Sequence, residues 1–310
     1  MASISIKAPP IKIAAAFVIL YLVWGSTYLA IRIGVLTFPP ALFAGVRFIL
    51  AALLLTAYAR FQGQTLPHTA REWKIITVIA LLLIVGGNGL VVWGEQHVPS
   101  NIAALTVASV ALWIAGLGTL GPQGERLTRQ SKLGLTVGFV GVLILLAPQG
   151  GTFSAVKTQA QLIIALAAIS WASGTIYGRR QKPRTPPLMS AALQMLIGGI
   201  ILCVFGLANG EYTRLVLTSS SLLALAYLVI FGSCLAYAAY VWLMHTVTPA
   251  KLGTYAYINP GIAVALGWWW LHEKLSRPQL IGMIIILAGV VLVTTAKSVK
   301  RSPDGPRSPD

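Results

Sequence analysis

The side chains that could do chemistry in this sequence are amides, hydroxyls and aromatic rings set inside long apolar runs. Asn88 stands among glycines in one run, and its amide could bond a carboxylate or an amine. Trp24 and Trp171 occupy central positions in two other runs, and Tyr28 shares a helical face with Trp24 by i, i+4 spacing. Aromatic walls suit an apolar or aromatic group and allow cation–π contact with an amine. These residue types favour reversible binding of a small molecule.

A second cluster lies nearer the C-terminal end of the chain. Tyr255 and Asn259 are one helical turn apart, and Pro260 follows directly. Because proline has no N–H group, it frees a carbonyl one turn back, so local irregularity is expected here. The residues predicted to bind a substrate are Trp24, Tyr28, Asn88, Ser109, Trp171, Thr175, Tyr237, Tyr255 and Asn259. For each of them the alternative is packing between helices.

Composition determines the class of protein. Hydrophobic residues make up 56% of the 310 residues and charged residues 10%, and the mean hydropathy is +0.79. Because soluble domains carry about 25% charged residues, this chain could not cover a globular surface, and we expect an all-α integral membrane protein. Ten apolar runs have the length of membrane-spanning helices: residues 13–33, 41–59, 75–94, 101–120, 133–148, 161–178, 188–208, 221–243, 251–271 and 279–296.

The formal net charge of +16 invites a nucleic-acid partner, but the charges follow membrane topology instead. With the N-terminus inside, 17 of the 23 Lys and Arg residues fall on the inner side and 4 on the outer side. This excess follows the positive-inside rule. It predicts a multi-pass protein of the bacterial inner membrane with both termini cytoplasmic, in contact with lipid and with no nucleic acid. The first run lacks a small-residue cleavage site, so we expect an uncleaved helix.

The sequence repeats itself at a fixed distance. Pro99 precedes Pro249 by 150 residues, and Glu125 precedes Glu273 by 148. Each half contains five spans, and five is an odd number, so the second half enters the membrane from the opposite side. The halves are therefore expected to form an inverted repeat around a central cavity, a layout that favours alternating access.

The repeat also sets the expected domains. We expect a first five-helix repeat over residues 1–150 and a second, inverted one over residues 151–298. Residues 299–310 have the composition of a disordered tail, which the topology places in the cytoplasm.

Short motifs in both halves resemble the drug/metabolite transporter superfamily, in particular its EamA-type bacterial exporters. The resemblance covers nearly all of residues 13–296. The segments that carry it are residues 23–28, 46–48, 98–100, 124–127, 255–260, 273–275 and 287–290. It implies ten helices around a central cavity built mainly from helices 1, 3, 4, 6, 8 and 9. It also implies export of amino acids and other small metabolites, with aromatic preferences in some members.

Two charged residues stand close to or within spans. Glu95 ends the third run and is a candidate gate or proton site, with a solvated helix end as the alternative. Arg47 lies six residues into the second run, where it could snorkel to the interface, pair with Glu95 or attract an anionic group. No carboxylate is expected at mid-membrane, where proton-driven carriers usually have one.

The predicted function follows from these features. We expect an exporter of small metabolites, most of all amino acids and among them aromatic or other apolar ones, that works by alternating access without strong proton coupling. Proton-linked efflux of drug-like organic cations is the alternative. No catalytic residues, metal site or cofactor are predicted, because the four His residues lie at helix ends and no mid-span acid accompanies them. A monomer or weak dimer is expected.

Overall fold

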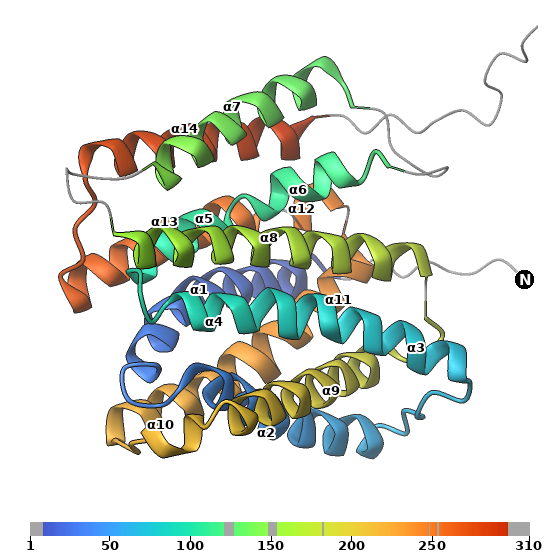
Figure 1. Ribbon diagram of the computed structural model, residues 1–310. Coiled ribbons are helices and arrows are strands. Elements are labelled where there is room, and N and C mark those ends of the chain that lie inside the picture. Colours follow the sequence, from blue (N-terminus) through green and yellow to red (C-terminus); the bar gives the residue numbers. More distant parts are fainter. Residues whose placement is uncertain are drawn as a thin grey trace, which may run out of the picture.

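The computed structural model describes residues 9–120, 127–147, 154–181, 183–247, 249–252 and 254–296. Within these residues every regular element is a helix (Figure 1). Nine helices in this part of the chain are long and apolar enough to cross a membrane. They are α1 (Pro10–Gly34), α2 (Pro40–Phe61), α3–η1–α4 (Ala70–Ile79, Ala80–Gly89, Leu90–Gly94), α5–α6 (Ser100–Val107, Val110–Leu117), α7 (Arg129–Leu146), α8 (Ala155–Gln181), α9 (Pro187–Ala208), α10–η3–α11 (Ser219–Tyr227, Leu228–Leu235, Ala236–Thr246) and α14 (Arg277–Thr295).

A tenth apolar helix completes the predicted set. It is α13 (Tyr255–Leu271), which has 17 residues and follows the short α12 (Pro249–Leu252). The predicted all-α membrane architecture is confirmed. Several helices extend beyond the predicted runs, because hydropathy detects the part in the hydrocarbon core and not the polar turns at its edges. Glu125 and the predicted tail, residues 299–310, lie outside the described residues.

Helix starts are set by the same residue types in both halves. The side chains of Thr69 and Thr218 cap α3 and α10 by accepting hydrogen bonds from backbone N–H groups three residues on, both at 3.2 Å. Thr128 and Ser276 cap α7 and α14 in the same way. A hydroxyl at this position satisfies a backbone donor that the helix itself leaves free. The duplicated start signals therefore give the two halves the same succession of helices.

The third long helix of each half contains a π-helical segment. These segments are η1 in the first half and η3 in the second. A π-turn inserts an extra residue into the helix and is often found at functional sites. Gly87 and Asn88 lie in η1, and Gly232 and Ser233 lie in η3. Both segments border the central cavity described below.

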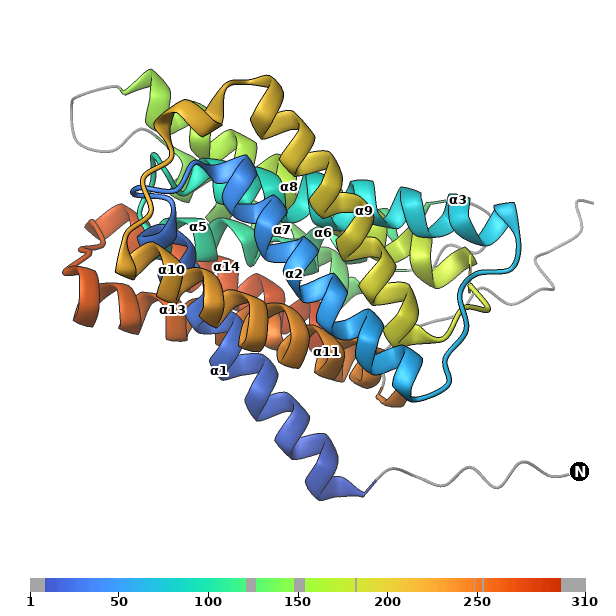
Figure 2. The same ribbon diagram turned by 90° about the horizontal axis from the view of Figure 1, so that it is seen from below.

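Equivalent helices of the two halves pack against each other at opposite edges of the bundle. In Figure 1, α7 and α14 lie together at one edge, α2 and α9 lie toward the other, and the remaining helices fill the space between them. Glycines allow the close approach: a Cβ atom on Gly199 of α9 would lie 2.9 Å from the Gly45 carbonyl oxygen of α2. Small residues serve this purpose in membrane helix pairs. Figure 2 shows the first turns of α1 extending away from the bundle, where Ile11 is 75% exposed.

We expect Gly141→Ala to lower the free energy of unfolding by about 1–3 kcal/mol, the usual cost of overpacking. A Cβ atom there would lie 2.6 Å from the Ile286 backbone nitrogen and 3.0 Å from the Gly282 carbonyl oxygen, so α7 and α14 must move apart. Thermal unfolding in detergent measures the change. Gly116→Ala is the matched control, because no atom lies within 4 Å of its added Cβ. An equal effect of both variants would contradict close α7–α14 packing.

Candidate functional site

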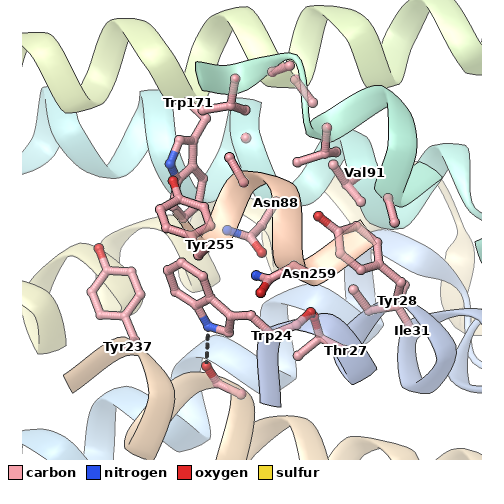
Figure 3. Close-up of a pocket in the computed structure, with 18 of the residues that line it drawn as sticks. Trp24, Thr27, Tyr28, Ile31, Asn88, Val91, Trp171, Tyr237, Tyr255 and Asn259 are labelled. Carbon is pink, nitrogen blue, oxygen red and sulfur yellow. Dashed lines mark hydrogen bonds between the residues drawn. The ribbon is translucent and has the colours of Figure 1, made fainter. Parts of the chain in front are cut away.

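A cavity lies between the two halves and encloses about 840 Å³, including its opening. The lining comes from the six spans that the resemblance implies, α1, η1–α4, α5–α6, α8, η3–α11 and α13, and also from α2 and α9. Figure 3 shows the side chains that project into it. Seven of the predicted binding residues are among them: Trp24, Tyr28, Asn88, Trp171, Tyr237, Tyr255 and Asn259.

Trp24 is the centre of an aromatic cluster in this cavity. Its ring centroid lies 5.0 Å from that of Tyr240, 5.5 Å from that of Tyr255 and 6.0 Å from that of Trp171. The Trp171 and Tyr255 rings meet it edge to face, an arrangement favoured by aromatic quadrupoles. The indole N–H of Trp24 donates to the Gly232 carbonyl oxygen at 3.2 Å. Rings from both halves thus form one wall that can hold an apolar or aromatic group.

Two amides enter the cavity from opposite halves. Figure 3 shows the side chains of Asn88 and Asn259 projecting into the same space, next to the ring of Trp24. The Asn88 amide nitrogen donates to the Leu83 carbonyl oxygen at 3.2 Å, which leaves its oxygen as an acceptor. The Asn259 side-chain oxygen is buried and has no hydrogen-bond partner in the described part of the chain. Both amides can therefore hydrogen-bond a polar group of a ligand.

Pro260 adds a backbone acceptor to the same wall. It lies inside α13, where a proline cannot donate the usual hydrogen bond to the carbonyl four residues earlier. That carbonyl belongs to Ala256, and both residues line the cavity. A released carbonyl suits a ligand N–H or ammonium group.

Two predicted binding residues are not among the cavity-lining residues. The Ser109 hydroxyl is buried and donates to the Thr106 carbonyl oxygen at 2.7 Å. The Thr175 hydroxyl donates to the Trp171 carbonyl oxygen at 2.9 Å. Hydroxyl groups in helices commonly bond the preceding turn in this way. Each hydroxyl group therefore has a hydrogen-bond acceptor within its own helix.

The position of Arg47 was harder to predict from the sequence. Snorkelling of Arg47 to the interface is wrong, because its side chain is only 4% exposed and lines the cavity. Arg32 of α1 is also held within the fold, since its guanidinium donates to the Glu95 carbonyl oxygen. The residues that hold Arg47 come from distant parts of the chain, and its presence in an apolar run was the available signal.

Glu95 is fully buried, so the alternative of a solvated helix end is wrong. Neither carboxylate oxygen has a hydrogen-bond partner within the described ranges. The carboxylate interacts electrostatically with Arg32 and Arg47, which are attractive, and with Glu273, which is repulsive. Glu95 does not itself line the cavity. It places a buried carboxyl group next to the cavity without reaching into it.

Glu273 joins the two halves at the end of the bundle where α5 begins. Its carboxylate accepts hydrogen bonds from the backbone N–H groups of Ser100 at 2.8 Å and Asn101 at 3.1 Å. The Ser100 hydroxyl donates to the same carboxylate at 2.9 Å. An acid in this position satisfies free N–H groups and complements the helix dipole. This end, which we call the Glu273 end, is closed: Ser100 and Glu95 are both 0% exposed.

The opposite end of the bundle is looser. Residues 113–119, at the far end of the α5–α6 span, are all partly exposed, whereas residues 100–106 are all buried. The cavity between these ends is therefore tightly sealed on one side. Within the described residues, no group of three or more His, Cys, Asp or Glu side chains could hold a metal ion.

Comparisons with known proteins agree with this architecture. The model of the EamA-like transporter family matches residues 11–147 and again residues 158–295. The chain is 40% identical over 281 residues to the uncharacterized inner membrane transporter YedA of Escherichia coli strain K12, with 90% of this chain and 89% of that protein covered. It is 27% identical over 300 residues to the uncharacterized transporter YvbV of Bacillus subtilis strain 168, with 96% of each covered.

A solved structure supports the fold as well. A crystallised protein with 21% sequence identity superposes with a TM-score of 0.67, covering 91% of this chain and 96% of that one. The family match occurs once in each half, which agrees with the duplicated helix starts and paired helices described above. The chain belongs to the EamA-like transporter family and is a multi-pass membrane transporter rather than an enzyme.

Proposed function

We propose that this transporter exports small metabolites that combine a polar head with an apolar or aromatic side chain, amino acids above all. One observation carries the proposal: amides and aromatic rings from both halves meet in a single cavity. The rings around Trp24 suit the side chain of such a ligand, and Asn88 and Asn259 suit its polar head. The predicted binding residues that line the cavity are the proposed contacts.

Transport is proposed to occur by alternating access. The two halves are joined tightly at the Glu273 end and loosely at the other. In an alternating-access carrier, each of the two states is closed at one end and open at the other, and this arrangement fits one of them. The positive-inside count assigns the looser end to the cytoplasm, so this arrangement corresponds to an inward-facing state of an inner-membrane carrier. The outward-facing state exchanges the roles of the two ends.

We propose that transport is facilitated, with the substrate moving down its own gradient, rather than driven by a proton gradient. The described lining contains no Asp or Glu, and the buried acid Glu95 lies behind it. An acidic cavity is also what a carrier of organic cations needs to hold its substrate. The alternative of proton-linked efflux of drug-like cations is therefore less well supported by the cavity.

Glu273→Ala is expected to make the Glu273 end open more often. The substitution removes all three hydrogen bonds to α5 and should cost the closed state about 1.4 kcal/mol, within the usual range for a helix cap. The open population at this end then rises about tenfold. The measurement is the rate at which an impermeant thiol reagent, added on this side, modifies Val91→Cys in a variant without Cys203 and Cys234. Lys274→Ala is the control. An unchanged modification rate in Glu273→Ala would contradict the role of these three hydrogen bonds in keeping this end closed.

Reconstitution into liposomes tests the proposed function itself. The panel contains amino acids, nucleobases and cationic dyes, each measured with and without a pH gradient. We expect saturable movement of one or more apolar amino acids down their own gradient, little changed by a pH gradient. Accumulation of cationic dyes in response to the pH gradient, without transport of any amino acid, would overturn the proposal in favour of cation efflux.

A further inference from the structure

The cavity wall contains a buried cation that its protein neighbours leave partly unsatisfied. Arg47 is 4% exposed and lines the cavity at the boundary between α2 and η3. Its Nη1 is buried and has no hydrogen-bond partner in the described part of the chain. An unsatisfied buried donor on a charged group is costly, so such groups normally have a partner. The free Nη1 therefore points to an anionic ligand group.

The rest of the Arg47 side chain is held in place. Its Nε donates to the Ser233 hydroxyl at 2.9 Å, and the guanidinium carbon lies 4.7 Å from the centroid of the Phe48 ring. Gly232 makes room for it, because a Cβ atom there would lie 3.2 Å from Nη2. The guanidinium is thus fixed in orientation before any ligand arrives, which lowers the entropic cost of binding.

Glu95 does not take the place of that ligand. It attracts Arg47 electrostatically, but both of its carboxylate oxygens lack hydrogen-bond partners. The two groups therefore interact electrostatically without forming a hydrogen-bonded ion pair. Glu95 attracts the arginine electrostatically but does not satisfy Nη1, which has no hydrogen-bond partner among the described residues.

We infer that Arg47 is the carboxylate-recognition residue of this transporter, so that its substrates carry a carboxylate group that Nη1 binds. The inference rests on the proposed transport function and deepens it. Guanidinium groups match carboxylates geometrically and bind them by charge-assisted hydrogen bonds. A carboxylate on Arg47 leaves the amides and the Ala256 carbonyl for an amine and the Trp24 cluster for the side chain.

Three probes with the same phenyl ring test which head group Arg47 recognises. L-phenylalanine carries a carboxylate and an amine, phenylpyruvate only the carboxylate, and phenethylamine only the amine. L-leucine and 3-methylbutylamine form a second pair for an aliphatic side chain. Equilibrium binding to the purified full-length protein is measured for the wild type, Arg47→Gln, Arg47→Lys and Arg32→Gln. The readout is the ratio of affinities for a carboxylate probe and its amine partner, which does not depend on the folded fraction of a variant.

The wild type is expected to prefer carboxylate probes over their amine partners. Arg47→Gln should reduce that ratio by about 10–100-fold, the usual effect of losing a charged hydrogen bond. The affinity ratio of Arg47→Lys should lie between those of the wild type and Arg47→Gln, because lysine keeps the positive charge but not the planar, forked geometry of the guanidinium group. Arg32→Gln should leave the ratio unchanged, since Arg32 is not among the cavity-lining residues.

The outcomes separate this inference from the proposed function. Binding of amino acids with a ratio that Arg47→Gln leaves unchanged overturns the role of Arg47 but not amino-acid transport. Arg47-dependent binding of phenylpyruvate without binding of amino acids supports the role of Arg47 and contradicts the amino-acid proposal. A wild type that binds no carboxylate probe, or prefers the amine partner, overturns the inference.

Discussion

Trp24→Ala is expected to abolish measurable transport, with substrate affinity reduced at least about 100-fold. The indole packs against three other rings, and its N–H is bonded to Gly232. Truncating a large ring in a packed site costs about 3–5 kcal/mol, and part of this loss falls on the wall that the substrate contacts. Uptake by proteoliposomes and direct binding of L-phenylalanine measure the effect.

Matched variants separate binding from folding in this prediction. Trp24→Phe retains a ring but loses the hydrogen bond to Gly232, so it should keep transport with an affinity reduced about fivefold. Trp269→Ala is the control for loss of a tryptophan, because Trp269 is 66% exposed. A Trp24→Ala protein that elutes as a single species and still transports at the wild-type rate would reduce Trp24 to a packing residue.

The second large effect concerns the buried charges. Glu95→Ala should lower the free energy of unfolding by about 3 kcal/mol, because it removes the buried acid that interacts electrostatically with the buried Arg47. The change is measured by thermal or denaturant unfolding in detergent. Gln96→Ala, one residue further on, should have an effect below about 1 kcal/mol, since the Gln96 side chain is only partly buried.

A double-mutant cycle shows whether the two charges are coupled. Arg47→Met combined with Glu95→Ala should be more stable than the sum of the single effects indicates, by about 1–3 kcal/mol. The reason is that the double variant buries no unbalanced charge. Additive effects would mean that Glu95 stabilises the protein by some means other than its interaction with Arg47.

Much of the fold could be predicted because the relevant signals are local. Apolar length gives the spans, and the hydroxyl groups of Thr128 and Ser276 mark the starts of equivalent helices. The aromatic part of the cavity was also accessible to prediction. Trp24 and Trp171 lie deep within apolar runs, far from the interfaces where tryptophan is ordinary.

The remainder depends on contacts that no local pattern contains. Arg47 could be read as snorkelling, since only the positions of Ser233 and Glu95 show that it is held inside. Glu95 follows the last helical residue of its span, a position that looks solvated in the sequence but is fully buried in the fold. Ser109 and Thr175 are not among the cavity-lining residues for a different reason. A hydroxyl within a helix can bond its own backbone, and the sequence does not show which way it points.

The central claim is that one cavity is reached alternately from the two sides of the membrane and holds the substrate in between. Val91 lines the cavity towards the closed Glu273 end. Its cysteine variant, without Cys203 and Cys234, is treated with an impermeant thiol reagent in right-side-out and in inside-out vesicles. We expect modification from both sides, slowed by a transported amino acid. Modification from one side only, or at a rate that no transported substrate changes, would contradict alternating access through this cavity.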